Sequence, residues 1–121
     1  MKAGIDSVEV KRFKKIKKLD KFLTKYFTDY EINYILSKNK KRYETIAGLF
    51  SAKEAFLKAL KIGIGAGISL KFVEIKHDNN FAPYININKK INKLEKEHNI
   101  NEVTLSITHT KKTATAICII T

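Results

Sequence analysis

The sequence has no tryptophan, one cysteine, one proline and one methionine among its 121 residues. Because Cys118 is alone, no disulfide can form within the chain, and the thiolates of a structural zinc site are missing. Cys118 lies in the apolar run 114–120, so we expect a small buried side chain. No apolar run approaches the ~20 residues that span a bilayer, and residues 1–6 lack the apolar stretch of a signal peptide. These absences favour a cytoplasmic protein with no membrane partner.

Acidic residues are also scarce, since 24 lysines and arginines face 12 aspartates and glutamates, for a formal net charge of +12. Such a charge attracts an anionic partner: a nucleic acid, a phosphorylated small molecule or an acidic protein. The alternative is a surface of solvated lysines without a specific partner. Arg12 and Arg42 are the only arginines, and reading DNA bases relies on arginine. A nucleic-acid-binding module is therefore the weaker rival, which a salt-dependent shift of nucleic acid would reveal.

The length fits one domain over residues 1–121. The apolar periodicities and turn residues indicate an α+β chain, with helices first and a small, mostly antiparallel sheet second, packed on a long central helix. We expect strands over residues 3–10, 69–76, 84–87, 103–108 and 113–120, and helices over 11–18, 29–36, 43–61 and 91–98. Residues 37–41 read as a loop.

The central helix is the strongest of these predictions. Residues 43–61 contain no proline, and their apolar side chains surround the axis, as in a buried helix. The glycines at 63, 65 and 67 should end it. Thr28 and Glu31 have the spacing of a capping box at the start of the helix 29–36.

Glu54 and Lys58 are four residues apart and share one face of the central helix. A surface ion pair is the commoner explanation of such a pair. Because burying charge without a partner is expensive, charges inside an apolar helix suggest a site with a metal on Glu54 and an anion near Lys58. Asp6 at a strand end would alone indicate a cap for the next helix.

The block 106–110 surrounds His109 with hydroxyls, which alone indicates a hairpin end. The three histidines lack the close spacing of a structural zinc site, and no P-loop, dinucleotide fingerprint or nucleophile elbow occurs.

Taken together, five blocks resemble the small holo-[acyl-carrier-protein] synthases of the 4'-phosphopantetheinyl transferase superfamily. They occur in the family's order over nearly the whole chain, and the central helix is the most specific. The blocks are residues 4–12 (GIDSVEVKR), 27–31 (FTDYE), 47–60 with 63–65 (AGLFSAKEAFLKAL, GIG), 83–84 (PY) and 106–110 (SITHT).

This resemblance implies the 4'-phosphopantetheinyl transferase fold and a Mg²⁺-dependent transfer of phosphopantetheine from coenzyme A to a serine of acyl carrier protein, for fatty-acid biosynthesis. Asp6 and Glu54 should hold Mg²⁺, and Lys58 should contact the pyrophosphate. The same three residues are the implied catalytic set, and the base is Glu54 or a metal-bound water. A carrier-binding protein without catalysis is a third possibility, which the retention of all three disfavours.

The resemblance also implies the binding residues. Coenzyme A should contact Lys58, Gly65, Pro83, His109, Thr110 and Arg42. Arg12, Lys11 and Lys15 should contact the acidic carrier protein. Relatives of this type are commonly homotrimers with sites between subunits, so Lys40, Lys41 and Arg42 should reach a neighbour's site.

Three places depart from the family pattern. Leu49 stands where many relatives have arginine, and Lys61-Ile62 replaces a smaller pair before Gly63. The residues 80–82, Asn-Phe-Ala, replace the usual Gly-Lys before Pro83, at the implied adenine pocket. None of these is an implied metal or transfer residue.

Overall fold

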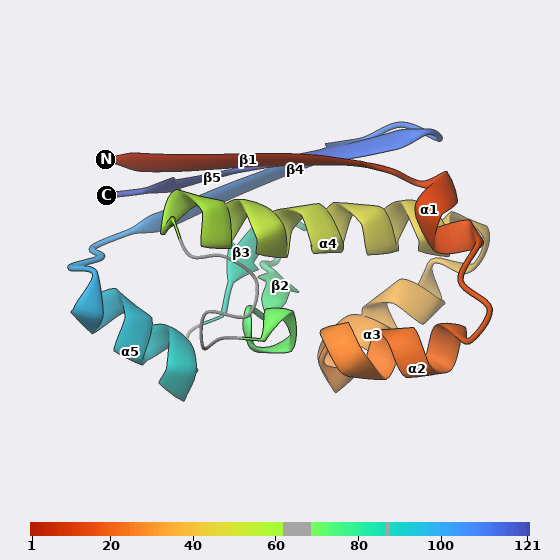
Figure 1. The fold of residues 1–121 in the computed structure, drawn as a ribbon, viewed down its shortest axis with the longest axis horizontal. Helices are drawn as coiled ribbons and strands as arrows, with labels where there is room; N and C mark the ends of the chain where they lie inside the picture. Colours follow the sequence, from red (N-terminus) through yellow and green to blue (C-terminus); the bar gives the residue numbers. More distant parts are fainter. Residues whose placement is uncertain (62–68, 87) are drawn as a thin grey trace.

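A computed structural model of the chain describes residues 1–61, 69–86 and 88–121 (Figure 1). The strands are β1 (Lys2–Glu9), β2 (Ile75–His77), β3 (Pro83–Ile85), β4 (Val103–His109) and β5 (Thr113–Ile120). The α-helices are α1 (Lys11–Lys14), α2 (Leu19–Tyr26), α3 (Asp29–Ser37), α4 (Arg42–Ala59) and α5 (Lys89–Glu97), and the 3₁₀ turns are η1 (Asn39–Lys41) and η2 (Leu70–Phe72). Among the described residues, no helix is long and apolar enough to cross a membrane.

The main sheet has the order β1-β5-β4, and all its pairs are antiparallel. β5 is central because it pairs with β1 on one side and with β4 on the other. Every second residue of β5, from Ala114 to Ile120, is buried on the side that packs against α4, and the residues between face away. β2 and β3 form a separate hairpin. The α+β class and the antiparallel sheet on a long helix are confirmed.

α4 runs along one face of the sheet, with α1 to α3 near one end and α5 near the other (Figure 1). It is buried nearly all round because the sheet covers one side, and α1, α3 and β2 cover others. The predicted end at the glycines was wrong. The helix ends at Ala59, and Lys61 has a positive φ of 58°, so the chain leaves the helix before residues 63–67, which lie outside the described residues.

Two further predictions needed correction, and one helix was missed. The helix predicted over residues 11–18 ends at Lys14, since Ile16 bonds back only to Phe13 in a tight turn. α2 was not predicted. The strand expected over 69–76 begins instead with η2, where the Ser69 hydroxyl accepts from the Lys71 amide, and only its end joins β2.

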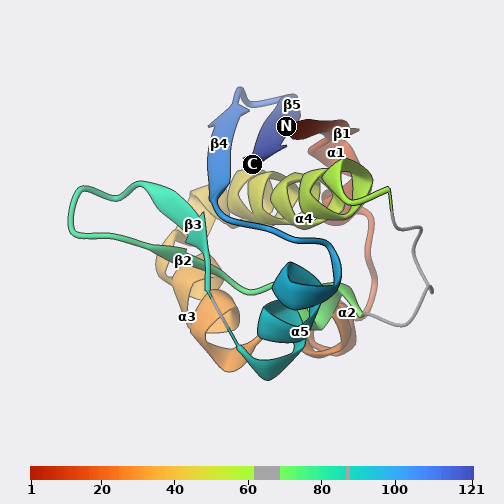
Figure 2. The same cartoon turned by 90° about the vertical axis from the view of Figure 1, so that its left-hand side faces the viewer.

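The capping box of α3 is confirmed. The Glu31 amide donates to the Thr28 hydroxyl, and the Thr28 amide donates to the Glu31 carboxylate. Seen from the side, the β2–β3 hairpin projects from the body next to β4, above α3 (Figure 2). The two chain ends lie together at one end of the sheet (Figure 1).

Candidate active site

β1 crosses α4 at unusually close range. A Cβ on Gly4 would lie 2.0 Å from the Ala55 backbone oxygen and 2.5 Å from the Ala59 nitrogen, so only glycine fits there. Two residues further along the same strand face, Asp6 points toward α4 with 12% of its side chain exposed. The close approach of β1 thus sets the place of Asp6.

Lys58 meets Asp6 on this strand. Its Nζ donates to Asp6 Oδ1 at 2.8 Å and to the Ile5 carbonyl at 3.3 Å. The hydrogen bond to Asp6 raises the pKa of Lys58, which therefore stays charged. Lys58 is not a buried charge of the apolar central helix, as its place in the sequence suggested, because its side chain is 54% exposed and its partner is Asp6.

Glu54 lies one turn before Lys58 and is partly buried. Burial raises its pKa, and the nearby Asp6 carboxylate raises it further, while the charges of Lys58 and Arg12 oppose the shift. Asp6 Oδ2 is buried and has no hydrogen-bond partner among the described residues. Two carboxylates, one with an unused oxygen, and one solvent-facing ammonium therefore form a compact cluster.

The predicted carrier-binding residues lie beside this cluster. Arg12 is close enough for its charge to act on Glu54, and its guanidinium lies over the rings of Phe50 and Phe13, at 5.1 and 5.6 Å. With Lys11 and Lys15 it lines a shallow surface depression of about 490 Å³.

A second group gathers around the first half of α4. A pocket of about 220 Å³ is lined by Tyr34, Glu44, Thr45, Gly48, Leu49, His77, Phe81, Pro83, Ile107 and His109. His109 Nδ1 lies 3.6 Å from Glu44 Oε2. The pocket thus brings together two predicted coenzyme A residues, Pro83 and His109.

The other predicted coenzyme A residues are placed differently. Thr110 is not among the lining residues, and its hydroxyl accepts from the amides of Lys112 and Thr113 in the β4–β5 turn. Arg42 begins α4, and its Nε donates to the Asn39 carbonyl. Gly65 lies outside the described residues.

The pocket and the carboxylate cluster do not meet within one chain. Glu44 and Glu54 are ten residues apart on one helix, which corresponds to about 15 Å along its axis. Among the described residues, no group of three histidine, cysteine or acidic side chains could hold a metal unaided. A metal here would need ligands from a substrate or water.

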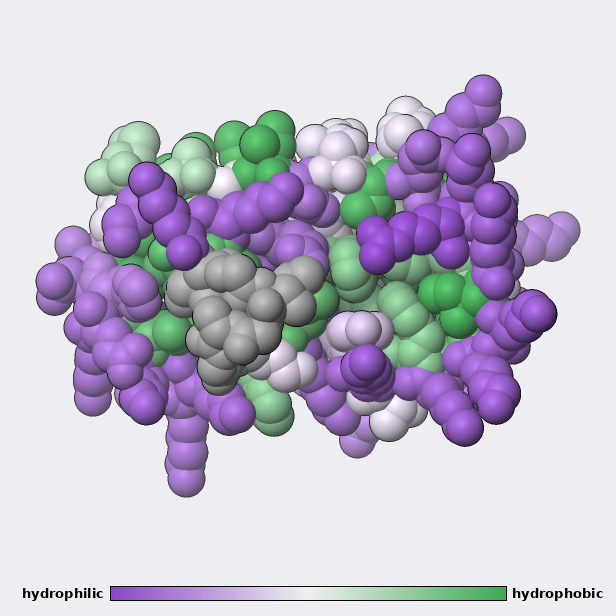
Figure 3. All heavy atoms as spheres, viewed as in Figure 1, coloured by the Kyte–Doolittle hydropathy of each residue, from purple (hydrophilic) through white to green (hydrophobic). Residues whose placement is uncertain are grey.

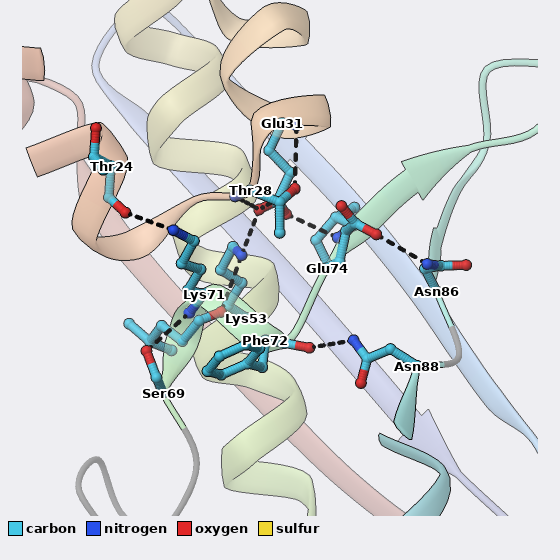
Figure 4. Close-up of polar contacts among 12 residues, drawn as sticks. Thr24, Thr28, Glu31, Lys53, Ser69, Lys71, Phe72, Glu74, Asn86 and Asn88 are labelled. Atoms are coloured by element: carbon cyan, nitrogen blue, oxygen red, sulfur yellow. Dashed lines mark hydrogen bonds and ion pairs between the residues drawn. The ribbon is translucent and has the colours of Figure 1, made fainter. Parts of the chain in front are cut away.

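A fully buried ion pair lies elsewhere in the described part of the chain and was not predicted. Lys53 Nζ donates to Glu31 Oε1 at 2.7 Å and to the Leu70 carbonyl at 3.0 Å, while the Ile75 amide donates to Glu31 Oε2 at 2.8 Å (Figure 4). Both side chains are fully buried. Desolvation raises the pKa of Glu31 and lowers that of Lys53, and these hydrogen bonds oppose both shifts.

This pair joins α3, α4, η2 and β2 into one unit. The available signal was Lys53 itself, a charge inside a helix predicted to be apolar all round. Glu31 already had an explanation as the partner in a capping box, so nothing in the sequence marked it as the partner of Lys53.

Comparison with known proteins defines the class. The family model of the 4'-phosphopantetheinyl transferase superfamily matches residues 2–118. A holo-[acyl-carrier-protein] synthase of Caldicellulosiruptor saccharolyticus is 44% identical over 116 residues, which cover 96% of this chain and 92% of that protein. One of Finegoldia magna is 42% identical over 120 residues, with 99% and 95% coverage.

Solved structures support the same class. The Helicobacter pylori holo-[acyl-carrier-protein] synthase in complex with coenzyme A matches with a TM-score of 0.84 at 34% identity, covering 98% of this chain and 99% of that one. The Bacillus anthracis enzyme in complex with CoA (3',5'-ADP) matches with a TM-score of 0.79 at 32% identity, covering 98% and 94%. The chain therefore belongs, within the superfamily, to the holo-[acyl-carrier-protein] synthases.

Proposed function

We propose that the cluster of Asp6, Glu54 and Lys58 is the centre at which this enzyme transfers 4'-phosphopantetheine from coenzyme A to a serine of apo acyl carrier protein. The serine oxygen forms a bond to the β-phosphorus, the bond from that phosphorus to the bridging oxygen breaks, and adenosine 3',5'-bisphosphate leaves. The observation that carries the proposal is the convergence of two carboxylates and an ammonium from β1 and α4. In a family of fatty-acid synthesis enzymes, the acceptor is the carrier of that pathway.

The residues fit Mg²⁺. Asp6 lies close enough to Glu54 for its charge to act on that carboxylate, and Asp6 Oδ2 is buried without a partner among the described residues. Mg²⁺ prefers hard oxygen ligands from one or two carboxylates with substrate phosphates and water. Asp6 and Glu54 would hold the ion, which would offset the negative charge of the pyrophosphate when bound.

Lys58 has the position to act on the pyrophosphate. Its ammonium is charged, anchored by Asp6 and open to solvent, so it can bind a phosphate oxygen and stabilise charge that develops on the leaving group. Glu54 lies close to Asp6 on the same side of the helix, so either Glu54 or a water bound beside it would take the proton of the attacking serine.

The carrier protein would dock beside this centre. Arg12 is held over two aromatic rings next to Glu54, and Lys11 and Lys15 flank it. An acidic carrier surface placed there would present its serine to the cluster, with electrostatic steering.

The outer face of the sheet supports the proposed homotrimer. Its outward positions on β1, β4 and β5 carry alanine, isoleucine, serine and threonine, and Glu9 is their one charged residue. Ile5, 61% exposed, pairs with the exposed Ile117. In Figure 3, green and white atoms gather along the upper edge, where β1 lies.

A neighbouring subunit would also complete the site. Because the cluster and the pocket lie about 15 Å apart along α4, we propose that coenzyme A lies between subunits. Its nucleotide end would bind the pocket of Pro83 and His109 and the basic residues near Arg42, and its pyrophosphate would reach the cluster of a neighbour.

The transfer is tested by mass spectrometry of an apo carrier protein incubated with the enzyme, coenzyme A and Mg²⁺. The carrier should gain one phosphopantetheine, and EDTA should prevent the gain. Glu54→Ala should abolish transfer while the chain stays folded, and Glu97→Ala on the exposed face of α5 should not. An unchanged carrier mass, when a known synthase modifies the same sample, would overturn the proposal.

The assembly is tested by sedimentation velocity. Wild-type protein should sediment as a trimer, Ile5→Glu should shift it toward monomers, and Leu36→Glu, at an exposed leucine of α3, should not. Co-expressed Glu54→Ala and His109→Ala chains should recover activity that neither has alone. A monomeric wild type with full activity would refute sites shared between subunits.

A further inference from the structure

The tip of the β2–β3 hairpin presents an aromatic ring to solvent. Phe81 is 81% exposed and has a φ of 63°. Glycine adopts this conformation freely, whereas a bulky side chain adopts it rarely and with strain. The ring gains little burial in return, so the fold of this chain alone does not explain it.

Hydrogen bonds to Asp78 stabilise the turn that carries Phe81. Asp78 Oδ1 accepts from the amides of Asn80 and Ala82 at 2.8 and 2.9 Å, and the Phe81 amide donates to the Asp78 carbonyl at 3.0 Å. These bonds close the turn on both sides of Phe81, so the ring is presented from a defined position.

Phe81 borders the 220 Å³ pocket, and the same pocket has a stacked aromatic pair in its lining. The rings of Tyr34 and His77 lie 4.2 Å apart and nearly parallel, and Lys38 Nζ lies 4.6 Å from the centre of the Tyr34 ring. Leu49 and Pro83 add apolar surface. The pocket is therefore bordered by flat aromatic groups and floored by apolar ones.

Two polar atoms in the pocket lack strong partners. His77 Nδ1 is buried with no hydrogen-bond partner among the described residues. The Glu44 carboxylate lies 3.6 Å from His109 Nδ1, which is too long for a hydrogen bond. The Glu44 carboxylate, which keeps some exposed surface in the pocket, can accept a hydrogen bond from an amino group on the edge of a heteroaromatic ring.

The size of the pocket limits what it holds. Its volume of about 220 Å³ is below the roughly 300–1,000 Å³ of pockets that enclose a whole drug-sized ligand. It suits one ring system with the rest of the molecule outside. Lys38, Lys40, Lys41 and Arg42 follow Tyr34 closely in the chain and supply positive charge for phosphates.

We infer that Phe81 is a specificity-determining residue of this chain, whose ring closes over the base of coenzyme A at the mouth of this pocket. The inference rests on the proposed function and deepens it. Residues 80–82 are one of the places where this chain departs from the pattern that the family resemblance implies, so the contact is inferred for this chain alone.

Direct binding tests the inference without turnover. Isothermal titration calorimetry should show that Phe81→Ala weakens the binding of adenosine 3',5'-bisphosphate by about 5- to 150-fold, which is the range that stacking on a base gives. Ribose 3,5-bisphosphate, which lacks the base, should bind wild type and variant equally. Phe81→Trp should keep the affinity for adenosine 3',5'-bisphosphate. Tyr84 is an exposed aromatic residue of β3 outside the pocket lining, so Tyr84→Ala should change the affinity for neither bisphosphate.

Kinetics separates this inference from the proposed function. In Phe81→Ala the loss should fall on the KM for coenzyme A more than on kcat. The role of Phe81 would be overturned if Phe81→Ala lost the same affinity for both bisphosphates, or lost no affinity for either. A variant changed only in its oligomeric state would overturn it as well. A wild type that binds adenosine 3',5'-bisphosphate through Phe81 but modifies no carrier would instead refute the transfer and leave the stacking contact standing.

Discussion

Replacing Lys53 by methionine should destabilise this protein more than any surface substitution. The change keeps the length of the side chain but removes its ammonium. Glu31 then loses its counter-charge, and the Leu70 carbonyl loses its donor. Both side chains of the pair are fully buried, so water cannot replace the lost partner.

The size of the effect follows from this burial. Removing one partner of a buried ion pair costs about 3–5 kcal/mol, because the remaining charge is uncompensated. A chain of this length has a free energy of unfolding of about 6–18 kcal/mol. The loss is therefore a large share of the total and should lower the Tm by roughly 12–20 °C.

Urea denaturation followed by circular dichroism measures the change. The matched control is Lys93→Met, because Lys93 is an exposed lysine 3.7 Å from Glu97 on α5, where the loss should be below about 0.5 kcal/mol. The double variant with Glu31→Gln removes both charges and should be more stable than Lys53→Met alone by at least about 1 kcal/mol. A loss below about 1 kcal/mol, or a double variant that is the sum of its singles, would refute the reasoning.

Three further predictions follow. Gly4→Ala would place a Cβ 2.0 Å from a backbone oxygen of α4 and should cost about 3 kcal/mol of stability or prevent folding. Its control is Gly48→Ala, whose Cβ meets only a side-chain methyl at 3.1 Å. In the same urea assay this control should change stability by less than about 1 kcal/mol. Burial raises the pKa of the Cys118 thiol to about 12, so about one thiol in ten thousand is ionised at pH 8; a thiol reagent should label it only after unfolding, and rapid labelling of native protein would contradict this. The folded state raises the pKa of Glu54 above 4.5, so the charge of Glu54 opposes folding at neutral pH. With EDTA present, Glu54→Gln should therefore unfold at a higher urea concentration than wild type. This difference should shrink as the pH falls through the raised pKa.

Much of the fold was predictable because its signals are local. The all-round apolar helix, the capping box of Thr28 and Glu31, and the β-branched hairpin at the end of the chain each depend on neighbouring residues. The missed parts depend on competition between local bonds. η2 forms where a strand was expected, since the Ser69 hydroxyl bonds to the backbone two residues on.

The site was predictable only in part. The spacing of Glu54 and Lys58 placed them on one helix face, but Asp6 depended on the family resemblance. Its place is set by the contact of Gly4 with the backbone of α4, fifty residues away in the chain. Such a contact leaves no periodic signal, so the hydrogen bond between Asp6 and Lys58 could not be derived from the sequence.

The argument from buried charge applies most fully to a residue that it did not name. A charge in a helix that is apolar all round does need a partner, and here that charge is Lys53. Lys53 and Glu54 are neighbours whose side chains point about 100° apart: one faces α3 and β2, and the other faces β1. Periodicity cannot fix that rotation when every side of the helix is apolar. Only the tertiary contacts therefore separate the structural charge of Lys53 from the charge of Glu54, for which we propose a catalytic role. Because of this difference, we expect Lys53→Met to lose stability and Glu54→Ala to lose transfer activity.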